Sequence, residues 1–186
     1  MSLKDWRRFK TIGGYALPFH IKRSHPLSSR DLKKFLQEVQ ALYTGFSKLA
    51  LGKPRVTVVE FSSGELLYYI NGAPLLLQIE GRLLPSLRAP DSLFEGVPRV
   101  VVDMGAVPHV VNGADVMAPG VVSYAGSFSE GDVVVVVDER HGKRLSVGIA
   151  LRSCENFLSP RRGKVIRNLH YVGDRVWKFT EEKPSI

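Results

Sequence analysis

The first clear pattern of apolar and polar positions along the chain has the spacing of a helix. Between residues 32 and 43 the apolar side chains recur every three or four positions, which places them on one face of an α-helix. They are Leu32, Phe35, Leu36, Val39, Leu42 and Tyr43. Ser28 precedes this stripe and can cap it, with Asp31 at the third helical position, where a capping box usually has Glu or Gln. The pattern predicts a helix of about four turns that begins after Ser28.

Strand-like segments follow this helix. Residues 55–61 are rich in β-branched side chains and end at a Ser-Ser-Gly turn. Residues 65–70 end at Asn71-Gly72, the strongest short signal for a hairpin, and residues 75–79 end near a glycine. The stretch 84–98 contains three prolines and reads as a connection to a second unit. The first part of the chain therefore predicts one helix and an antiparallel meander.

The second part of the chain predicts a compact β-barrel with one short helix. The expected elements are strands at 100–102, 132–138 and 145–151, a short helix at 105–111, and a last hairpin of 168–172 with 175–179 around Gly173-Asp174. In 145–151 large residues alternate with small ones, so one face packs in a core and the other permits close approach of a neighbour. Short strands that close on one another favour a barrel. We expect an α+β protein with units at 1–96 and 97–180 and a tail at 181–186.

Charge is segregated along the chain, and this suggests a partner. The 186 residues have a formal net charge of +8. Residues 1–55 carry 12 Lys and Arg against 3 Asp and Glu, residues 56–139 carry 3 against 11, and residues 140–186 carry 11 against 4. Basic surface at the two ends favours a polyanion, most often nucleic acid. A solvated basic protein without a specific anionic partner is the alternative.

Signatures of catalysis and of membrane insertion are missing from the sequence. It contains no phosphate-binding loop and no nucleophile elbow. The five histidines lack metal-site spacing, and the single cysteine, Cys154, is interpreted as a small apolar residue at a strand end. No apolar run approaches the length of a membrane span, and the N-terminus lacks the apolar core of a secretory signal. We expect a cytoplasmic protein with no enzyme activity, no metal and no cofactor.

The stretch GADVMAPGV, residues 113–121, is the candidate binding site. Gly113 follows the short helix, where a glycine lets the chain reverse, and Pro119-Gly120 suits the centre of a type II turn. These structural roles can explain both glycines. Alternatively, a glycine-lined groove beside a helix end offers bare N–H groups and room for a nucleotide backbone.

Two further sets of side chains could complete such a groove. Arg161, Arg162, Lys164 and Arg167 form a basic cluster that could hold phosphates or be an ordinary exposed loop. His170, Tyr171 and Trp177 could stack on unpaired bases, although Tyr and Trp are more often half-buried core residues.

Two stretches resemble the signature of the PUA domain, which is named for pseudouridine synthases and archaeosine transglycosylases. They are Val102-Asp103-Met104-Gly105-Ala106-Val107 and Val111-Asn112-Gly113-Ala114-Asp115-Val116-Met117-Ala118-Pro119-Gly120-Val121. With 168–177 and the segment 71–88, the whole chain is identified as an archaeal-type member of the malignant-T-cell-amplified-sequence family, whose domain pair also forms the N-terminal part of ligatin. The resemblance implies a C-terminal PUA pseudo-β-barrel after an N-terminal helix-plus-meander domain.

The same resemblance implies a function and a site. It indicates a cytoplasmic protein of translation that binds RNA, either the tRNA acceptor end or rRNA, on the small ribosomal subunit in initiation or recycling. The implied nucleotide-binding residues are Asn112, Gly113, Ala114, Asp115, Met117, Ala118, Pro119, Gly120, Arg175 and Lys178. Eukaryotic members work with an initiation-factor-like protein, which is a candidate partner here. A protein-interaction module of a translation complex and an accessory protein of RNA modification are the alternative functions.

Overall fold

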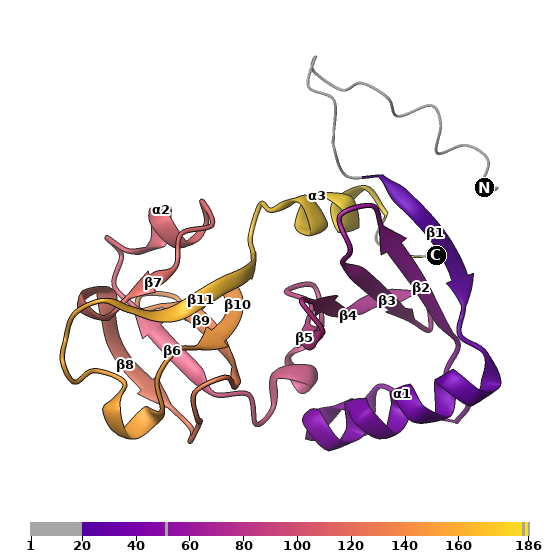
Figure 1. Cartoon of the computed structure of the whole chain (residues 1–186), viewed down its shortest axis with the longest axis horizontal. Coiled ribbons are helices and arrows are strands. Elements are labelled where there is room, and N and C mark those ends of the chain that lie inside the picture. The colour runs from indigo at the N-terminus through magenta and orange to yellow at the C-terminus, as the bar shows by residue number, and fades with distance from the viewer. Residues whose placement is uncertain (1–19, 51, 184, 186) are drawn as a thin grey trace, which may run out of the picture.

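The N-terminal unit is one helix packed on an antiparallel sheet. The computed structural model describes residues 20–50, 52–183 and 185. The sheet has the order β1-β2-β3-β4-β5 and is formed by β1 Ile21–Pro26, β2 Val56–Phe61, β3 Leu66–Ile70, β4 Ala73–Ile79 and β5 Arg82–Pro85. Helix α1, Ser29–Leu42, lies below this sheet in Figure 1. Its buried residues Phe35 and Val39 share a core with side chains of β2, β3 and β4, because only this face of the helix is apolar.

The predicted helix, the three predicted strands and the hairpin are confirmed. The Ser28 hydroxyl oxygen accepts a hydrogen bond from the Asp31 N–H at 3.2 Å, as an N-cap does. Asn71 and Gly72 both have positive φ, 51° and 88°, which suits the tight turn between β3 and β4. Strands β1 and β5 were not predicted. Both lie at sheet edges, where β1 carries polar and charged residues and β5 ends in Pro85, so neither has the apolar pattern of a central strand.

The C-terminal unit is a curled six-stranded sheet of order β7-β11-β10-β9-β6-β8. Its elements are β6 Arg99–Val102, α2 Val107–Val110, β7 Val116–Met117, β8 Val121–Ala125, β9 Val133–Asp138, β10 Arg144–Ala150 and β11 Lys164–Tyr171. Strands β6 and β9 are parallel, and the other pairs are antiparallel. The two edge strands β7 and β8 are joined by a short 3₁₀ turn at 118–120, so the chain itself closes the sheet. The pseudo-β-barrel and the α+β class are confirmed.

Strand β10 shows the close approach that its alternating side-chain sizes predicted. A Cβ added at Gly148 would lie 2.3 Å from the backbone oxygen of Arg167 on β11. That distance is far below van der Waals contact, so this position of the strand accepts only glycine.

The predicted last hairpin is wrong, because residues 175–182 form a helix. Strand β11 ends at Tyr171, and α3 spans Arg175–Glu182. Asp174 is its N-cap, and its Oδ1 accepts a hydrogen bond from the Trp177 N–H at 2.7 Å. The buried residues Val176 and Thr180 are four positions apart, which is the spacing of a helix face. Residues 181 and 182, assigned from the sequence to a tail, therefore belong to this helix.

Helix α3 returns from the C-terminal unit to the N-terminal sheet, as Figure 1 shows in yellow. The ring of Phe179 meets Phe61 of β2 edge-on, with centroids 5.0 Å apart. The Tyr69 hydroxyl donates to the backbone oxygen of Lys183 at 2.7 Å. Buried side chains of both sheets and of α3 form a single cluster: Val59, Phe61, Leu67, Tyr69, Leu77, Leu84, Leu87, Val135, Val137, Val147, Ile149 and Val176. The two units thus share a core, while the division at residue 96 stays a prediction.

A buried histidine joins the two units beside this cluster. His170 is 1% exposed. Its Nε2 accepts a hydrogen bond from the Leu87 N–H at 3.2 Å, so the ring proton lies on Nδ1, which donates to Asp174 Oδ2 at 2.7 Å. The same carboxylate oxygen accepts the Tyr171 N–H at 3.0 Å. Asp174 therefore orients the buried ring and begins α3.

We expect Asp174→Ala to lower the free energy of unfolding by about 3 kcal/mol, because it removes a helix cap and leaves the His170 N–H unpaired in the core. Chemical denaturation at neutral pH measures this. The matched control is Glu182→Ala on the exposed side of α3, which should change stability by less than about 0.5 kcal/mol. Equal effects of the two substitutions would contradict the role given to Asp174.

Candidate functional site

An open groove of about 850 Å³ lies between α2 and the turn that follows β7. In Figure 1 these elements are at the end of the C-terminal unit away from α1. The residues that line the groove are Asp103, Gly105, Ala106, His109, Val110, Gly113, Ala114, Asp115, Met117, Pro119, Gly120 and Lys164. All of them come from the C-terminal unit, so this unit alone can build the site.

Strand β11 holds the groove wall in place through Asn168. The Asn168 side-chain amide donates to the backbone oxygens of Val110 and Ala114, at 2.9 and 3.0 Å. Its backbone N–H donates to Asp115 Oδ1 at 3.0 Å. One residue therefore ties the end of α2 and the start of β7 to the sheet, which fixes the shape of the groove before any ligand enters.

Asp115 and Lys164 form an ion pair at the groove, with Nζ and Oδ2 2.8 Å apart. Partial burial of Asp115 raises its pKa, but the hydrogen bonds from Lys164 and Asn168 and the charges of Lys164 and Arg167 outweigh this, and the pKa lies below its ordinary value. The carboxylate is therefore ionised at neutral pH. The Lys164 side chain remains 62% exposed, so its ammonium group can also meet a ligand.

The glycines of the groove are explained by packing within the protein. Gly113 has φ of +86°, and a Cβ there would lie 2.9 Å from the ring of Tyr171. The Tyr171 ring, for which stacking on bases and a half-buried structural role were the two alternatives, thus covers Gly113. A Cβ at Gly120 would lie 3.0 Å from Ala106 Cβ. Gly120 has no left-handed φ and belongs to a 3₁₀ turn, so the predicted type II turn is wrong.

Main-chain donors of the turn are also occupied. The Gly113 N–H donates to the backbone oxygen of Val110. The N–H groups of Asn112 and Ala114 both donate to the backbone oxygen of His109. The expectation of bare N–H groups at this turn is wrong, because these groups donate hydrogen bonds to the last carbonyl oxygens of the short helix. Met117, which lines the groove and is 46% exposed, offers side-chain surface to a ligand.

The structure brings most of the predicted site residues together and separates the rest. Gly113, Ala114, Asp115, Met117, Pro119, Gly120 and Lys164 all line the groove. Asn112 is exposed in the same turn, and Arg162 is exposed beside Lys164. The Arg161 guanidinium donates to the backbone oxygen of Val121 at 2.8 Å, which places it at the groove edge beside Gly120.

Five predicted residues do not belong to this groove. Ala118 is 0% exposed, so its side chain cannot meet a ligand. His170 is 1% exposed with both ring nitrogens bonded, and the prediction that it stacks on bases is wrong. Arg167 pairs with Glu80 of the N-terminal unit, at 2.6 Å. Arg175 pairs with Glu65, and Arg175 and Lys178 lie on α3 instead of a last strand.

Some groove residues were not predicted. Asp103, Gly105 and Ala106 precede α2, and His109 and Val110 lie on it. The Asp103 carboxylate accepts the Ala106 N–H at 2.7 Å. The sequence does contain a signal for them, since residues 102–107 resemble part of the PUA-domain signature. Only the fold shows that this stretch lies opposite 113–120.

The described part of the chain lacks a membrane-spanning helix and a cluster of metal ligands. Within residues 20–50, 52–183 and 185 no helix is long and apolar enough to cross a membrane. The same residues contain no group of three or more His, Cys, Asp or Glu that could hold a metal ion.

Comparison with known proteins places this architecture. Residues 98–172 match the PUA domain family, and residues 23–89 match a family described as a domain of unknown function, DUF1947. A crystal structure from Pyrococcus horikoshii has a TM-score of 0.71 at 34% identity and covers 85% of this chain and 99% of that one. A PUA-domain structure from Aeropyrum pernix, in complex with tartrate, has a TM-score of 0.72 at 28% identity over 88% and 92%.

Relatives that match this chain over most of their own length identify the family to which it belongs. An uncharacterized protein of Methanocaldococcus jannaschii is 36% identical over 86% of this chain and 98% of its own length. Malignant T-cell-amplified sequence 1 of Rattus norvegicus is 30% identical over 81% and 85%. Translation machinery-associated protein 20 of Saccharomyces cerevisiae is 29% identical over 82% and 88%. The fold is that of a PUA-domain protein. The chain belongs to the malignant T-cell-amplified sequence family, as an archaeal-type member.

We expect Lys164→Met to raise the pKa of Asp115 toward its ordinary value, 3.8, because the carboxylate loses its nearest cation. A carboxyl group with a lowered folded pKa stabilises the protein above its unfolded pKa, and this contribution is lost as pH falls through the folded pKa. The variant should therefore lose about 0.5 kcal/mol at neutral pH and progressively less at a pH well below 3.8.

Carbon-detected NMR titration of the Asp115 carboxyl, with denaturation at both pH values, measures this. Lys178→Met is the control, because Lys178 is exposed on α3 and does not line the groove. An unchanged Asp115 titration in Lys164→Met would show that the pair does not persist in solution.

Proposed function

We propose that this protein is a non-enzymatic, cytoplasmic RNA-binding translation factor. It acts with tRNA on the small ribosomal subunit, in initiation or recycling. The groove of about 850 Å³ in a PUA domain supports this, because that volume is in the range of sites that hold small ligands or a nucleotide end. The relatives named translation machinery-associated protein support a role in translation.

Different side chains of the groove can contact the base and the phosphates of a single-stranded RNA end. Met117, 46% exposed, offers an apolar surface to a base. Lys164, Arg161 and Arg162 stand at the same end of the unit and can neutralise phosphates. The Asp103 carboxylate, whose Oδ1 accepts the Ala106 N–H, can accept a hydrogen bond from an exocyclic amine of a base at its other oxygen. An unpaired acceptor end suits such a site, because its bases are free to be read individually.

The lining of the groove supports binding without catalysis. Its titratable side chains are Asp103, His109, Asp115 and Lys164, and two of these neutralise each other. None of the lining residues is a serine, threonine or cysteine. A hydroxyl or thiol nucleophile, which many covalent mechanisms use, is therefore missing from this lining.

Replacing Arg161, Arg162 and Lys164 together with Glu should weaken tRNA binding at least tenfold and make the salt dependence of affinity shallower by about three units of log–log slope. Each lost phosphate contact no longer releases its counterion. Fluorescence anisotropy with labelled tRNA at several salt concentrations measures both effects.

The matched control has the same change of charge on the other unit: Arg30, Lys33 and Lys34, exposed on α1, replaced with Glu. Its effect should be clearly smaller. Equal losses in the two triple variants would mean that overall charge governs binding, and the basic cluster would not be the contact.

Met117→Ala should reduce the preference for tRNA with an intact single-stranded acceptor end over tRNA lacking it, by about threefold. The change removes exposed apolar surface and leaves the core intact, since Met117 is 46% exposed. Competition between the two tRNAs measures this preference. Substitution of Gly113 is unsuitable as a test, because any Cβ would meet Tyr171. No preference in the wild-type protein would remove the acceptor end from the proposal.

A further inference from the structure

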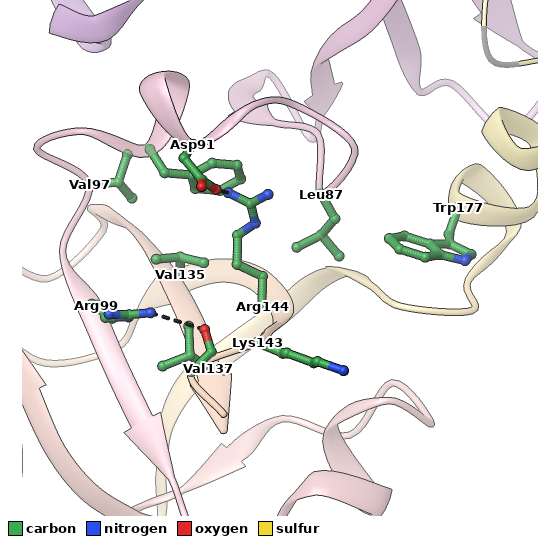
Figure 2. Close-up of a pocket in the computed structure, with 11 residues that line it drawn as sticks. Leu87, Asp91, Val97, Arg99, Val135, Val137, Lys143, Arg144 and Trp177 are labelled. Atoms are coloured by element: carbon green, nitrogen blue, oxygen red, sulfur yellow. Dashed lines mark hydrogen bonds and ion pairs between the residues drawn. The ribbon is translucent and has the colours of Figure 1, made fainter. Parts of the chain in front are cut away.

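A second cavity, of about 560 Å³, lies where the two units meet (Figure 2). It is separate from the groove, since no residue lines both. Its lining residues are Leu87, Asp91, Phe94, Val97, Arg99, Val135, Val137, Gly142, Lys143, Arg144 and Trp177. We call it the interdomain cleft. Its walls come from the 87–97 connection, β6, the β9–β10 hairpin and α3, so it exists only in the assembled molecule.

The floor of the interdomain cleft is apolar. Leu87, Val135 and Val137 are 5%, 4% and 1% exposed, and they belong to the core that the units share. Phe94 and Trp177 add aromatic surface that is partly buried against the same core. These side chains offer almost no hydrogen-bonding groups to a ligand. The floor therefore suits a bulky apolar side chain and lacks the donors and acceptors that would read the edge of a base.

The rim of the cleft is cationic. Arg99, Lys143 and Arg144 line it, against the single carboxylate Asp91. The Arg144 guanidinium lies 4.1 Å from the centre of the Phe94 ring and contacts Asp91 Oδ1 at 2.8 Å. The Asp91 side chain is 98% exposed, so water competes strongly for that pair. An acidic ligand can take the place of Asp91 on Arg144 at small cost.

Hydrogen bonds fix the backbone of the β9–β10 hairpin, which carries Lys143 and Arg144, and hold the Arg99 guanidinium against it. The Asp138 carboxylate accepts the N–H groups of Arg140, His141 and Lys143 at 3.0, 2.6 and 2.8 Å. The Arg99 guanidinium donates to the Gly142 oxygen at 3.0 Å, as drawn in Figure 2. The rim is thus formed before a ligand arrives, which lowers the entropy lost on binding.

We propose that the interdomain cleft binds a short acidic segment of a protein partner, with one bulky apolar side chain on the floor and flanking Asp or Glu residues on Arg99, Lys143 and Arg144. Complementary charge selects an acidic partner, and the aliphatic floor selects an apolar anchor. This site goes beyond the proposed RNA-binding function, since it uses other residues and would let the protein hold RNA and a partner at once.

The test uses the full chain and synthetic blocked peptides observed by NMR. The probes are Glu-Asp-Phe-Asp-Glu and Glu-Asp-Leu-Asp-Glu, and the control peptides are Glu-Asp-Ala-Asp-Glu and Lys-Arg-Phe-Arg-Lys. Uridine monophosphate is the nucleotide control. The reporters are the Trp177 indole N–H, assigned with Trp177→Phe, and the backbone amides of Leu87 and Val135. The first two peptides should shift these signals at millimolar concentration, and the controls should not.

Two variants give opposite expectations. Lys143→Glu should weaken binding of the Phe peptide about tenfold, and Asp91→Asn should strengthen it about threefold by removing the competing carboxylate. Lys34→Glu, on exposed α1, should have little effect and is the charge-matched control.

Several results would overturn the proposal. One is no shift with either acidic peptide, and another is a larger shift of the same reporters with uridine monophosphate, which would make the cleft a nucleotide site. Equal weakening by Lys34→Glu and Lys143→Glu would reduce the interaction to overall charge. None of these results depends on tRNA affinity, so failure here and failure of the RNA-binding function are distinguishable.

Discussion

The hydrogen bonds of buried His170 are the constraint on which the rest of this structure depends. One ring nitrogen accepts the Leu87 N–H of the N-terminal unit, and the other donates to Asp174, which begins α3. Buried polar groups are costly unless they are paired, so the chain is held where all three segments meet. This fixes the direction in which β11 leaves the barrel and sends α3 back onto the first sheet. The interdomain cleft lies beside this junction, with Leu87 and Trp177 in its walls.

Several carboxylates of the acidic middle segment, residues 56–139, have structural roles within the protein. These carboxylates accept hydrogen bonds from the protein's own backbone or form ion pairs with its cations. Asp103 accepts the Ala106 N–H, Asp138 accepts three N–H groups, and Asp115 pairs with Lys164. Hydrogen bonds from the N–H groups of His141, Lys143 and Arg140 lower the pKa of Asp138, although burial opposes them. Such carboxylates shape the groove and the cationic hairpin and add little repulsion against an anionic ligand.

In the proposed RNA binding, recognition in the groove rests mainly on side chains, because the N–H groups of residues 112–114 are already paired within the protein. The short helix uses the N–H groups of Asn112, Gly113 and Ala114 for its own end, and Tyr171 covers the bare face of Gly113. The glycines therefore serve the fold first and allow the turn to be tight. What remains open is a mixed surface around Met117 and Lys164. A surface of this kind can hold the end of a single-stranded RNA without a deep pocket for each base.

The amino-acid sequence by itself determined the elements whose causes are local. The apolar stripe and Ser28 define α1, Asn71-Gly72 defines a hairpin, and the signature around Gly113 marks the barrel and most of the groove. Tertiary structure decided what residues far apart in the chain do to one another. It packed helix 175–182 on the first sheet and buried His170 against Leu87. It also placed Tyr171 on Gly113 and joined Arg144 to Asp91 across the cleft. Periodicity records which face of a segment is apolar, but the partner of that face, and whether a polar group is buried against it, depend on contacts that no local pattern contains.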